Sequence, residues 1–469
     1  MVNNQVSDAP ILGEAKRGHG WKPILRGELA TAAVDAARAV SLRVSSPELV
    51  EAAAATAQQQ TAFPRSTHWI PYTISQGYAG LAVLWGYLDA CFPGEGWDLR
   101  GREHLELAVR SAETVHNPPI GLFSGLSGLA FGAWALSRQG TRYRHLLARL
   151  DDAICAETDQ SARGLYGQND GVTIGEFDVI SGASGVGAYL LCRRDQPNPA
   201  ATLSALIRAL IYLGDDERGV PRWHTPAHLL WDESMKESFP YGNLNCGLAH
   251  GIPGPLAFLS QSLRAGFVAP GLAETIARMA DFLCANRYDD EWGVNWPNAV
   301  PLEPAGNSSG GELRAGSAQS GSEEPSRCAW CYGSPGIARA LWLAGEALDR
   351  DDYRSLAVSS LEDVFRRPVP TRRIDSPTFC HGVAGLLAIT MRFANETGSP
   401  VFIEASRMLV EQLLDSYQPE SLLGFRNIEY GDREVDQPGL LDGAPGVALV
   451  LLAAATNVEP TWDRLFLLS

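Results

Sequence analysis

The amino-acid sequence predicts an all-α fold, an α/α toroid (barrel) of seven helical hairpins with seven inner and seven outer helices. Three observations predict it: a recurring Gly-x-x-Gly step, an apolar helix after each step, and an amphipathic helix between steps. The 469-residue chain is 45% hydrophobic, so it can bury a large core as one domain, 1–469. The seven steps are Gly77/Gly80, Gly125/Gly128, Gly182/Gly185, Gly251/Gly254, Gly333/Gly336, Gly382/Gly385 and Gly443/Gly446.

The segments that follow the steps predict the inner helices. Runs such as 81–85, 129–134 and 447–452 are apolar on nearly every side, as expected for helices that are buried all round. Glycine lacks a Cβ atom and therefore permits a sharp turn and a close approach between helices. We interpret each Gly-x-x-Gly step as the turn that begins an inner helix.

The segments between the steps predict the outer helices. Their apolar residues recur at i, i+3, i+4 and i+7, the pattern of a surface helix with one buried stripe. Residues 26–60 supply the first outer member. A large helical bundle and an open solenoid are the alternatives, because the sequence alone does not prove that the ring closes. The other outer segments are 102–116, 143–157, 202–213, 272–287, 352–366 and 402–417.

Three stretches depart from the repeat. Residues 1–22 form a polar N-terminal tail. Residues 215–245 contain many aromatic residues and prolines, which predicts an extended excursion along the face where the inner helices begin. Residues 306–326 are rich in glycine and serine, which predicts a flexible loop that is either an access flap or an inert surface insertion.

The composition excludes several classes of protein. The net charge of −16 and the pI near 5.1 argue against a nucleic-acid-binding surface. The N-terminus lacks the apolar core of a signal peptide, and no stretch approaches the ~18 apolar residues of a transmembrane segment. Eight dispersed cysteines do not form a disulfide framework. We therefore expect a cytoplasmic protein with reduced thiols.

The steps also carry the chemistry, because in a closed ring the side chains before each first glycine converge on one mouth. Cys331, Cys380 and His381 lie in the fifth and sixth steps and form a Cys2His set, which suits a catalytic zinc with one open position. A further thiol bound there would lose its proton at neutral pH. The residues before the first glycines are Gln76, Ser124, Ser181, His250, Tyr332, His381 and Asp442, and one position earlier they are Ser75, Phe123, Ile180, Ala249, Cys331, Cys380 and Leu441.

A neighbouring cysteine leaves other interpretations open. Cys328 and Cys331 form a Cys-x-x-Cys pair, which indicates either redox chemistry or a fourth, structural ligand from Cys328. A redox pair of this kind usually lies near a βαβ pattern, and no strand pattern is visible here. Cys246 is expected to belong to the core rather than to a metal site.

His250 occupies the step position equivalent to that of His381, and a histidine there can move a proton at neutral pH. A lone histidine is more often structural, and the repeat equivalence favours function. Asp178 lies four residues before its glycine, so it is expected either to orient His250, to pair with Arg327 or to cap a helix.

Four motifs in order give the chain its resemblance to the LanC-like lanthionine synthetases, the lantibiotic cyclases. They are Ser-Gly-Ala-Ser-Gly (181–185), Gly-Leu-Ala-His-Gly-Ile-Pro-Gly (247–254), Trp-Cys-Tyr-Gly-Ser-Pro-Gly (330–336) and Cys-His-Gly-Val-Ala-Gly (380–385). The resemblance extends from about residue 70 to the C-terminus and implies an α/α toroid with zinc at its mouth. It implies Cys331, Cys380 and His381 as zinc ligands, and His250, Asp178, Arg327 and Tyr332 as catalytic residues.

The implied reaction is the addition of a precursor-peptide cysteine to dehydroalanine or dehydrobutyrine, which forms a lanthionine or methyllanthionine ring. The implied substrate is a peptide already dehydrated by a separate dehydratase, and the implied partners are that dehydratase and an exporter. Their complex would place the protein peripherally at the membrane. The resemblance departs at 306–326, which is longer than expected, and in the accessory β module, for which 215–245 is the nearest counterpart.

Three other functions remain open from the sequence. The first is an enzyme of the same fold that adds glutathione to dehydroamino acids in proteins. The second is a toroid glycosidase, which needs two carboxylates at the mouth, with Asp178 and Asp442 as its candidates. The third is a non-catalytic scaffold in which zinc is only a structural staple.

Overall fold

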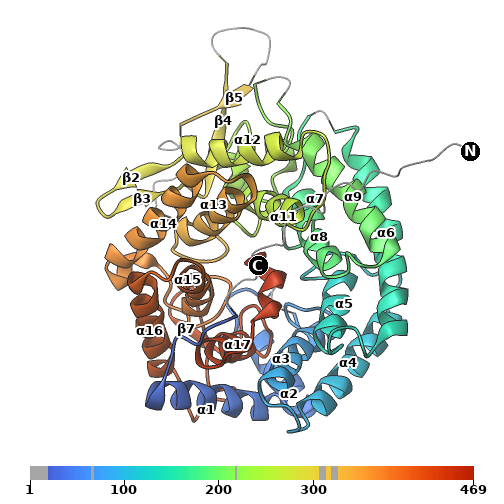
Figure 1. Ribbon diagram of the computed structural model, residues 1–469, viewed down its shortest axis with the longest axis vertical. Coiled ribbons are helices and arrows are strands. Elements are labelled where there is room, and N and C mark those ends of the chain that lie inside the picture. The colour runs from blue at the N-terminus through green and yellow to red at the C-terminus, as the bar shows by residue number, and fades with distance from the viewer. Residues whose placement is uncertain (1–19, 65–67, 169, 217–218, 306–312, 318–325) are drawn as a thin grey trace, which may run out of the picture.

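The computed structural model describes residues 20–64, 68–168, 170–216, 219–305, 313–317 and 326–469. It confirms the helical toroid: Figure 1 shows an inner ring of helices surrounded by an outer ring. Most of the predicted tail 1–22 and most of the predicted loop 306–326 lie outside the described residues. None of the helices in the described ranges is long and apolar enough to cross a membrane.

The inner ring is closed. Each inner helix contacts the next one along the chain, and the last, α17, contacts the first, α3. Six of the seven begin directly after the first glycine of a Gly-x-x-Gly step, and α11 begins one residue later. The helices are α3 (Tyr78–Cys91), α5 (Leu126–Ala135), α8 (Ala183–Cys192), α11 (Pro253–Arg264), α13 (Ser334–Leu348), α15 (Val383–Thr397) and α17 (Ala444–Ala455).

The outer ring is closed by the N-terminal helix. The segment 26–60, predicted as one outer member, is two helices, because Ser46 caps a new helix at the amide of Leu49 and proline fits its first position. The first of them, α1, packs on α17, so the first helix of the described chain pairs with the last inner helix. The outer helices are α1 (Gly27–Arg43), α4 (Trp97–Glu113), α6 (Arg144–Leu165), α9 (Pro197–Leu213), α12 (Leu272–Ala285), α14 (Asp351–Arg366) and α16 (Pro400–Asp415), with α2 (Pro47–Gln60) after α1.

Backbone hydrogen bonds join the seven turns into a second closed ring. The amide of Ser75 donates to the carbonyl of Phe123 at 3.2 Å, and the amide of Leu441 in the last turn donates back to the carbonyl of Ser75 at 3.2 Å. In the third turn the donor is Val179 instead of the aligned residue. The intermediate bonds run from Phe123 to Ile180 (3.0 Å), Val179 to Ala249 (3.0 Å), Ala249 to Cys331 (3.2 Å), Cys331 to Cys380 (3.2 Å) and Cys380 to Leu441 (3.1 Å).

The second glycine of each step lets neighbouring repeats approach closely. A Cβ atom added there would lie 2.7–3.4 Å from a side-chain carbon of the preceding repeat, at the residue three positions before that repeat's first glycine. Glycine is therefore required by packing and not only by the turn. The contacts are Gly128 on Ile74, Gly185 on Leu122, Gly254 on Val179, Gly336 on Leu248, Gly385 on Trp330, Gly446 on Phe379 and Gly80 on Leu440.

The C-terminal segment fills the hole of the inner ring. The short helix η4 (Thr461–Phe466) and the chain end lie at the centre of Figure 1. The Phe466 ring stacks on that of Phe379 at 3.7 Å, and the Phe466 carbonyl accepts a hydrogen bond from the Trp330 indole at 3.0 Å. The core is thus continuous across the centre of the toroid.

The described residues also contain short strands, which the all-α prediction did not include. Most have three residues, too few to show the alternation that identifies a strand in a sequence. The predicted excursion 215–245 contains η1 (Ala227–Leu229), α10 (Glu233–Ser238) and β1 (Asn243–Asn245), and 306–326 contains β5 (Leu313–Ala315). Both join β4 (Ala299–Pro304) in an antiparallel sheet of order β1-β4-β5.

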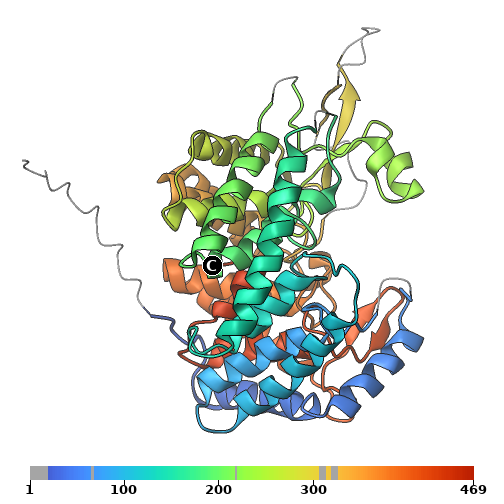
Figure 2. The same cartoon turned by 90° about the vertical axis from the view of Figure 1, so that its right-hand side faces the viewer.

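Two hairpins, β2 (Tyr288–Asp290) with β3 (Gly293–Asn295) and β6 (Asn427–Glu429) with β7 (Arg433–Val435), complete the strands of the described chain. The remaining short helices are α7 (Ile174–Phe177) and η3 (Val369–Arg372). In Figure 2, α10 and the orange β6–β7 hairpin project to the right, from segments that lead into inner helices. These short helices and strands therefore lie on the side of the ring that carries the turns.

Replacing Gly333 by alanine is expected to destabilise the fold. Its φ of +97° and ψ of −174° are accessible only to glycine, and an added Cβ would lie 1.5 Å from the Arg327 carbonyl oxygen. Backbone strain of this kind alone costs about 1–3 kcal/mol, and the clash adds to it. We expect a clear fall in the thermal unfolding midpoint. Gly164→Ala in α6 is the control, because no atom lies within 4 Å there, and it should unfold at or above the wild-type midpoint. Equal midpoints for the two variants would contradict the assigned turn geometry.

Candidate metal centre and active site

The ring of backbone hydrogen bonds gathers the predicted site residues at one mouth. It links Ala249, Cys331, Cys380 and Leu441 in direct succession. The side chains that follow these four positions in the sequence therefore come from neighbouring turns. They are His250, Tyr332, His381 and Asp442.

Cys380, His381 and Asp442 form a group suited to a metal ion. Their ligand atoms all lie within 4.8 Å of one another, and His381 Nδ1 is 3.7 Å from Asp442 Oδ1. Asp442 Oδ1 is buried and has no hydrogen-bond partner among the residues that the structure describes. Thiolate, imidazole and carboxylate are the ligands that zinc takes in proteins, so the donor set fits that ion. The sequence signal for Asp442 is its turn position, which is equivalent to that of His381.

Cys331 lies beside this group. Its thiol interacts with that of Cys380, and the hydrogen bond from Cys380 lowers the pKa of Cys331. The same bond, together with burial, raises the pKa of Cys380. The exposed guanidinium of Arg327 further lowers the pKa of Cys331 and makes no ion pair within the described chain. Cys331 falls outside the group of atoms that are mutually within 4.8 Å. Two neighbouring thiols, with Cys331 buried and Cys380 partly exposed, can both bind one cation as thiolates.

Cys328, the alternative ligand or redox partner, points to the core instead. It is buried, its burial raises its pKa to about 11, and it does not belong to the metal-ligating group found in the described part of the chain. Cys246 is also buried, which raises its pKa to about 12. All eight cysteines are free, as the sequence analysis expected.

His250 and Asp178 form a hydrogen-bonded pair. His250 Nδ1 lies 2.7 Å from Asp178 Oδ2, and Asp178 Oδ1 accepts the amides of Ser181 and Gly182 at 2.8 Å each. Asp178 therefore both orients the histidine and caps the turn before α8, and it makes no ion pair with Arg327. Its side chain is 2% exposed whereas that of His250 is 35% exposed, so the histidine faces the mouth and the carboxylate stands behind it.

Tyr332 lies between the two groups. Its ring centroid is 6.4 Å from that of His250, and it follows Cys331 directly in the chain. The Tyr332 hydroxyl oxygen accepts a hydrogen bond from the Asn245 amide at 3.0 Å. Burial raises the pKa of Tyr332, so the phenol stays protonated at neutral pH.

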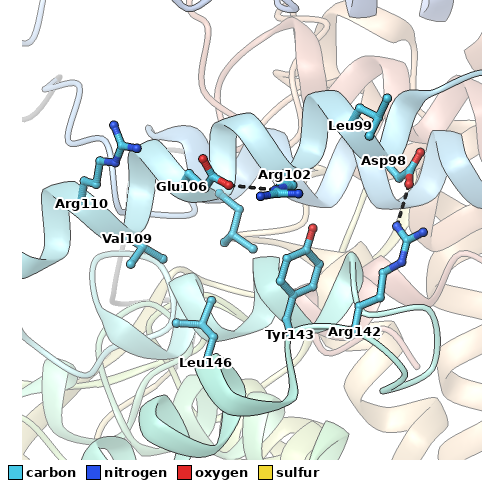
Figure 3. Close-up of a pocket in the computed structure, with 10 residues that line it drawn as sticks. Asp98, Leu99, Arg102, Glu106, Val109, Arg110, Arg142, Tyr143 and Leu146 are labelled. Atoms are coloured by element: carbon cyan, nitrogen blue, oxygen red, sulfur yellow. Dashed lines mark hydrogen bonds and ion pairs between the residues drawn. The ribbon is translucent and has the colours of Figure 1, made fainter.

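An open groove elsewhere on the molecule is separate from this mouth. It lies between the outer helices α4 and α6, with apolar residues such as Leu105 and Val109 in its lining (Figure 3). Two ion pairs bridge its charged residues, Arg102 with Glu106 at 2.9 Å and Arg142 with Asp98 at 2.6 Å. None of the predicted site residues contributes to it.

Comparison with known proteins identifies the family. The family model of the lanthionine synthetase C-like proteins matches residues 68–467, so the chain belongs to that family. The nisin biosynthesis protein of Lactococcus lactis subsp. lactis is 26% identical over 400 residues, which are 84% of this chain and 88% of that protein. The solved structure of a nisin cyclase has the same fold, with a TM-score of 0.71 and 24% identity over 89% of this chain and 96% of that one.

We expect the purified protein to bind about one zinc ion per chain, because the ligands form a single set. Cys380→Ala should lose the metal and keep its helical circular dichroism, because the fold is held by the core and not by the ion. Cys328→Ala is the matched control, a buried thiol outside the group, and should retain zinc. Zinc retained by the Cys380 variant, or lost equally from both variants, would place the metal elsewhere.

Asp442→Asn tests the residue that the structure adds to the group. Loss of a carboxylate next to a metal site weakens binding by roughly 10–100-fold. We expect a chelator to remove zinc from this variant at a lower concentration than it needs for the wild type, by the same factor. An unchanged competition curve would show that the Asp442 carboxylate does not interact with the metal.

Proposed function

We propose that the protein is a zinc-dependent lanthipeptide cyclase, an enzyme that joins cysteine to dehydroalanine or dehydrobutyrine within a peptide. The observation that carries the proposal is the meeting, at one mouth, of a thiol, imidazole and carboxylate group with an oriented histidine. Membership of the lanthionine synthetase C-like family supports it, as do the names of the similar proteins, a nisin biosynthesis protein and a nisin cyclase.

The metal would be held by Cys331, Cys380 and His381, with the carboxylate of Asp442 beside them. Zinc supplies acidity: a thiol that coordinates it is deprotonated at neutral pH, which makes a strong nucleophile. The chain's own contribution is to place the metal-binding residues at the mouth of the toroid, where a peptide can reach them. His250 lies in the preceding turn, so the thiol and the proton-transfer group are neighbours.

The reaction rearranges the atoms of one peptide. A bond forms between the cysteine sulfur and the β-carbon of the dehydro residue, and the π electrons of the C=C bond move onto the carbonyl to form an enolate. The enolate then takes a proton at Cα, so one S–H bond is replaced by one C–H bond. The product is an isomer of the substrate, and no oxidant or co-reactant is required.

His250 is proposed to move that proton. Asp178 Oδ1 accepts hydrogen bonds from two backbone amides, so the side chain is a carboxylate and its other oxygen, Oδ2, also accepts. The hydrogen between Asp178 Oδ2 and His250 Nδ1 is therefore carried by Nδ1. The other ring nitrogen, Nε2, is then unprotonated in the neutral imidazole and can take and return a proton. The nearly buried Asp178 stabilises the imidazolium that forms, and the positive charge of Arg327 favours thiolate at the mouth.

The alternative functions have less support. Each of the two carboxylates that a glycosidase needs lies beside a histidine. Asp178 forms a hydrogen bond with His250, and Asp442 lies next to His381. A scaffold with a structural zinc does not require the exposed His250 ring or its carboxylate. A dehydratase and an exporter remain the proposed partners. The proposed location is the cytoplasm, with peripheral attachment to the membrane through their complex.

His250→Asn tests the proposal. The asparagine amide can replace Nδ1 as the donor to Asp178, but it has no equivalent of Nε2. Loss of a general acid–base group lowers kcat by roughly 10²–10⁴-fold. The assay uses a synthetic peptide with one dehydroalanine and one cysteine. Because cyclisation leaves the mass unchanged, the product is measured as peptide that no longer reacts with a thiol-alkylating reagent.

The same assay includes glutathione as a competing thiol. Ring formation by the wild type, without a glutathione adduct on the peptide, supports the cyclase. Adduct formation without rings would establish the glutathione-adding alternative. Full activity in His250→Asn would remove the histidine from the proposed mechanism.

A further inference from the structure

Tyr332 is held in place by two residues that the proposed reaction does not use. Asn245, the last residue of β1, donates from Nδ2 to the Tyr332 hydroxyl oxygen at 3.0 Å. Gly247 lies against the tyrosine ring, where an added Cβ would be 2.6 Å from Cε1 and 2.7 Å from Cδ1. Asn245 thus fixes the hydroxyl, and Gly247 leaves the space that the ring occupies.

Asn245 is itself rigidly held. It is 5% exposed, it pairs with Ala299 of β4, and its carbonyl accepts the amide of Ile252 at 3.0 Å. Its side-chain oxygen accepts the amide of Gly247 at 2.9 Å. Because a backbone amide only donates, the atom that faces Gly247 must be the oxygen. The atom that faces Tyr332 is therefore the NH2 group, which can only donate.

This arrangement determines what the phenol can do. The Tyr332 oxygen accepts from Asn245, so its own hydrogen must be donated in another direction. In the described part of the chain that hydrogen has no acceptor. The Tyr332 hydroxyl therefore offers a hydrogen-bond donor on a side chain whose ring centroid is 6.4 Å from that of His250.

We propose that Asn245 is a positioning residue that holds the Tyr332 hydroxyl as a hydrogen-bond donor to the carbonyl oxygen of the dehydro residue under attack. This inference rests on the proposed function. Negative charge develops on that oxygen when the π electrons move to form the enolate, and a fixed donor aimed at it stabilises the transition state. Proton transfer by His250 is a separate step. The tyrosine therefore acts when sulfur adds to the β-carbon, and the histidine acts when the proton moves.

Asn245→Asp reverses the hydrogen bond with almost no change of shape. One carboxylate oxygen still accepts the Gly247 amide, and the other accepts the phenol hydrogen, so the hydroxyl no longer donates to substrate. The C–O stretching band of Tyr332, isolated as the infrared difference between each protein and its Tyr332→Phe counterpart, reports whether a phenol accepts or donates. We expect an accepting phenol in the wild type and a donating one in Asn245→Asp. The same band in both proteins overturns the proposal.

Kinetics with the synthetic peptide test the catalytic part. We expect kcat of Asn245→Asp to fall about 100-fold, as on loss of an oxyanion donor, with KM little changed. Tyr332→Phe should show a similar fall, and the double variant should be no slower than Tyr332→Phe alone. Losses that multiply in the double variant would overturn the proposal, because Asn245 would then act independently of Tyr332. Asn286→Asp, which introduces a carboxylate at the end of α12, is the control and should keep wild-type kcat.

The two arms separate this inference from the proposed function. If the wild type forms no thioether, the proposed function fails, and the infrared comparison still decides whether Asn245 orients Tyr332. If Asn245→Asp does not fold, the uncharged Asn245→Ser replaces it. Its Tyr332 band must then lose the accepting character, and an unchanged band overturns the proposal.

Discussion

The closed ring of backbone hydrogen bonds between the seven turns is the constraint on which the site depends. Six of the seven links join the same position of successive repeats, the third turn donates from Val179 instead, and the last link returns to the carbonyl of Ser75. Buried peptide groups must be paired, so opening one link would leave both of its partners unsatisfied. The ring therefore fixes the spacing of the turns, and with it the spacing of the side chains next to them.

The glycines make this ring possible. The first glycine begins the inner helix, and the second lies against an apolar side chain of the neighbouring repeat, closer than a Cβ would allow. The first helix and the C-terminal segment then complete the structure, since α1 packs on α17 and the C-terminal segment fills the central hole. A closed toroid of this kind gives its mouth a rigid frame, which a site with precise donor placement requires.

The polar groups of the mouth are arranged in supporting pairs. Asp178 stands behind His250, Asp442 beside His381, and Asn245 behind Tyr332. In the first and last pairs, the supporting side chain is more buried than the one it holds. Burial makes a hydrogen bond directional and expensive to break, because the partner has no access to water. In these two pairs the more exposed side chain thus receives a fixed orientation from the more buried one.

The repeat, the inner and outer helices and the turn positions that carry chemistry can be predicted from the amino-acid sequence. These features are local: a Gly-x-x-Gly step and a helical period are readable without knowing what packs on them. For the same reason Cys331, Cys380, His381 and His250 were recognisable, since they occupy equivalent places in the repeat. The family resemblance added Asp178, Arg327 and Tyr332 to the candidates.

How these residues meet depends on the folded chain, and the tertiary structure was needed to see it. In the folded chain the ring is closed, Asp442 lies within reach of Cys380 and His381, and Cys328 lies in the core. Residues 26–60 also form two helices, and the first of them pairs with the last inner helix. Asn245 carried no chemical signal in the sequence. Its role depends on a hydrogen bond to Tyr332, 87 residues further along the chain, and such a contact is created by folding and not by spacing.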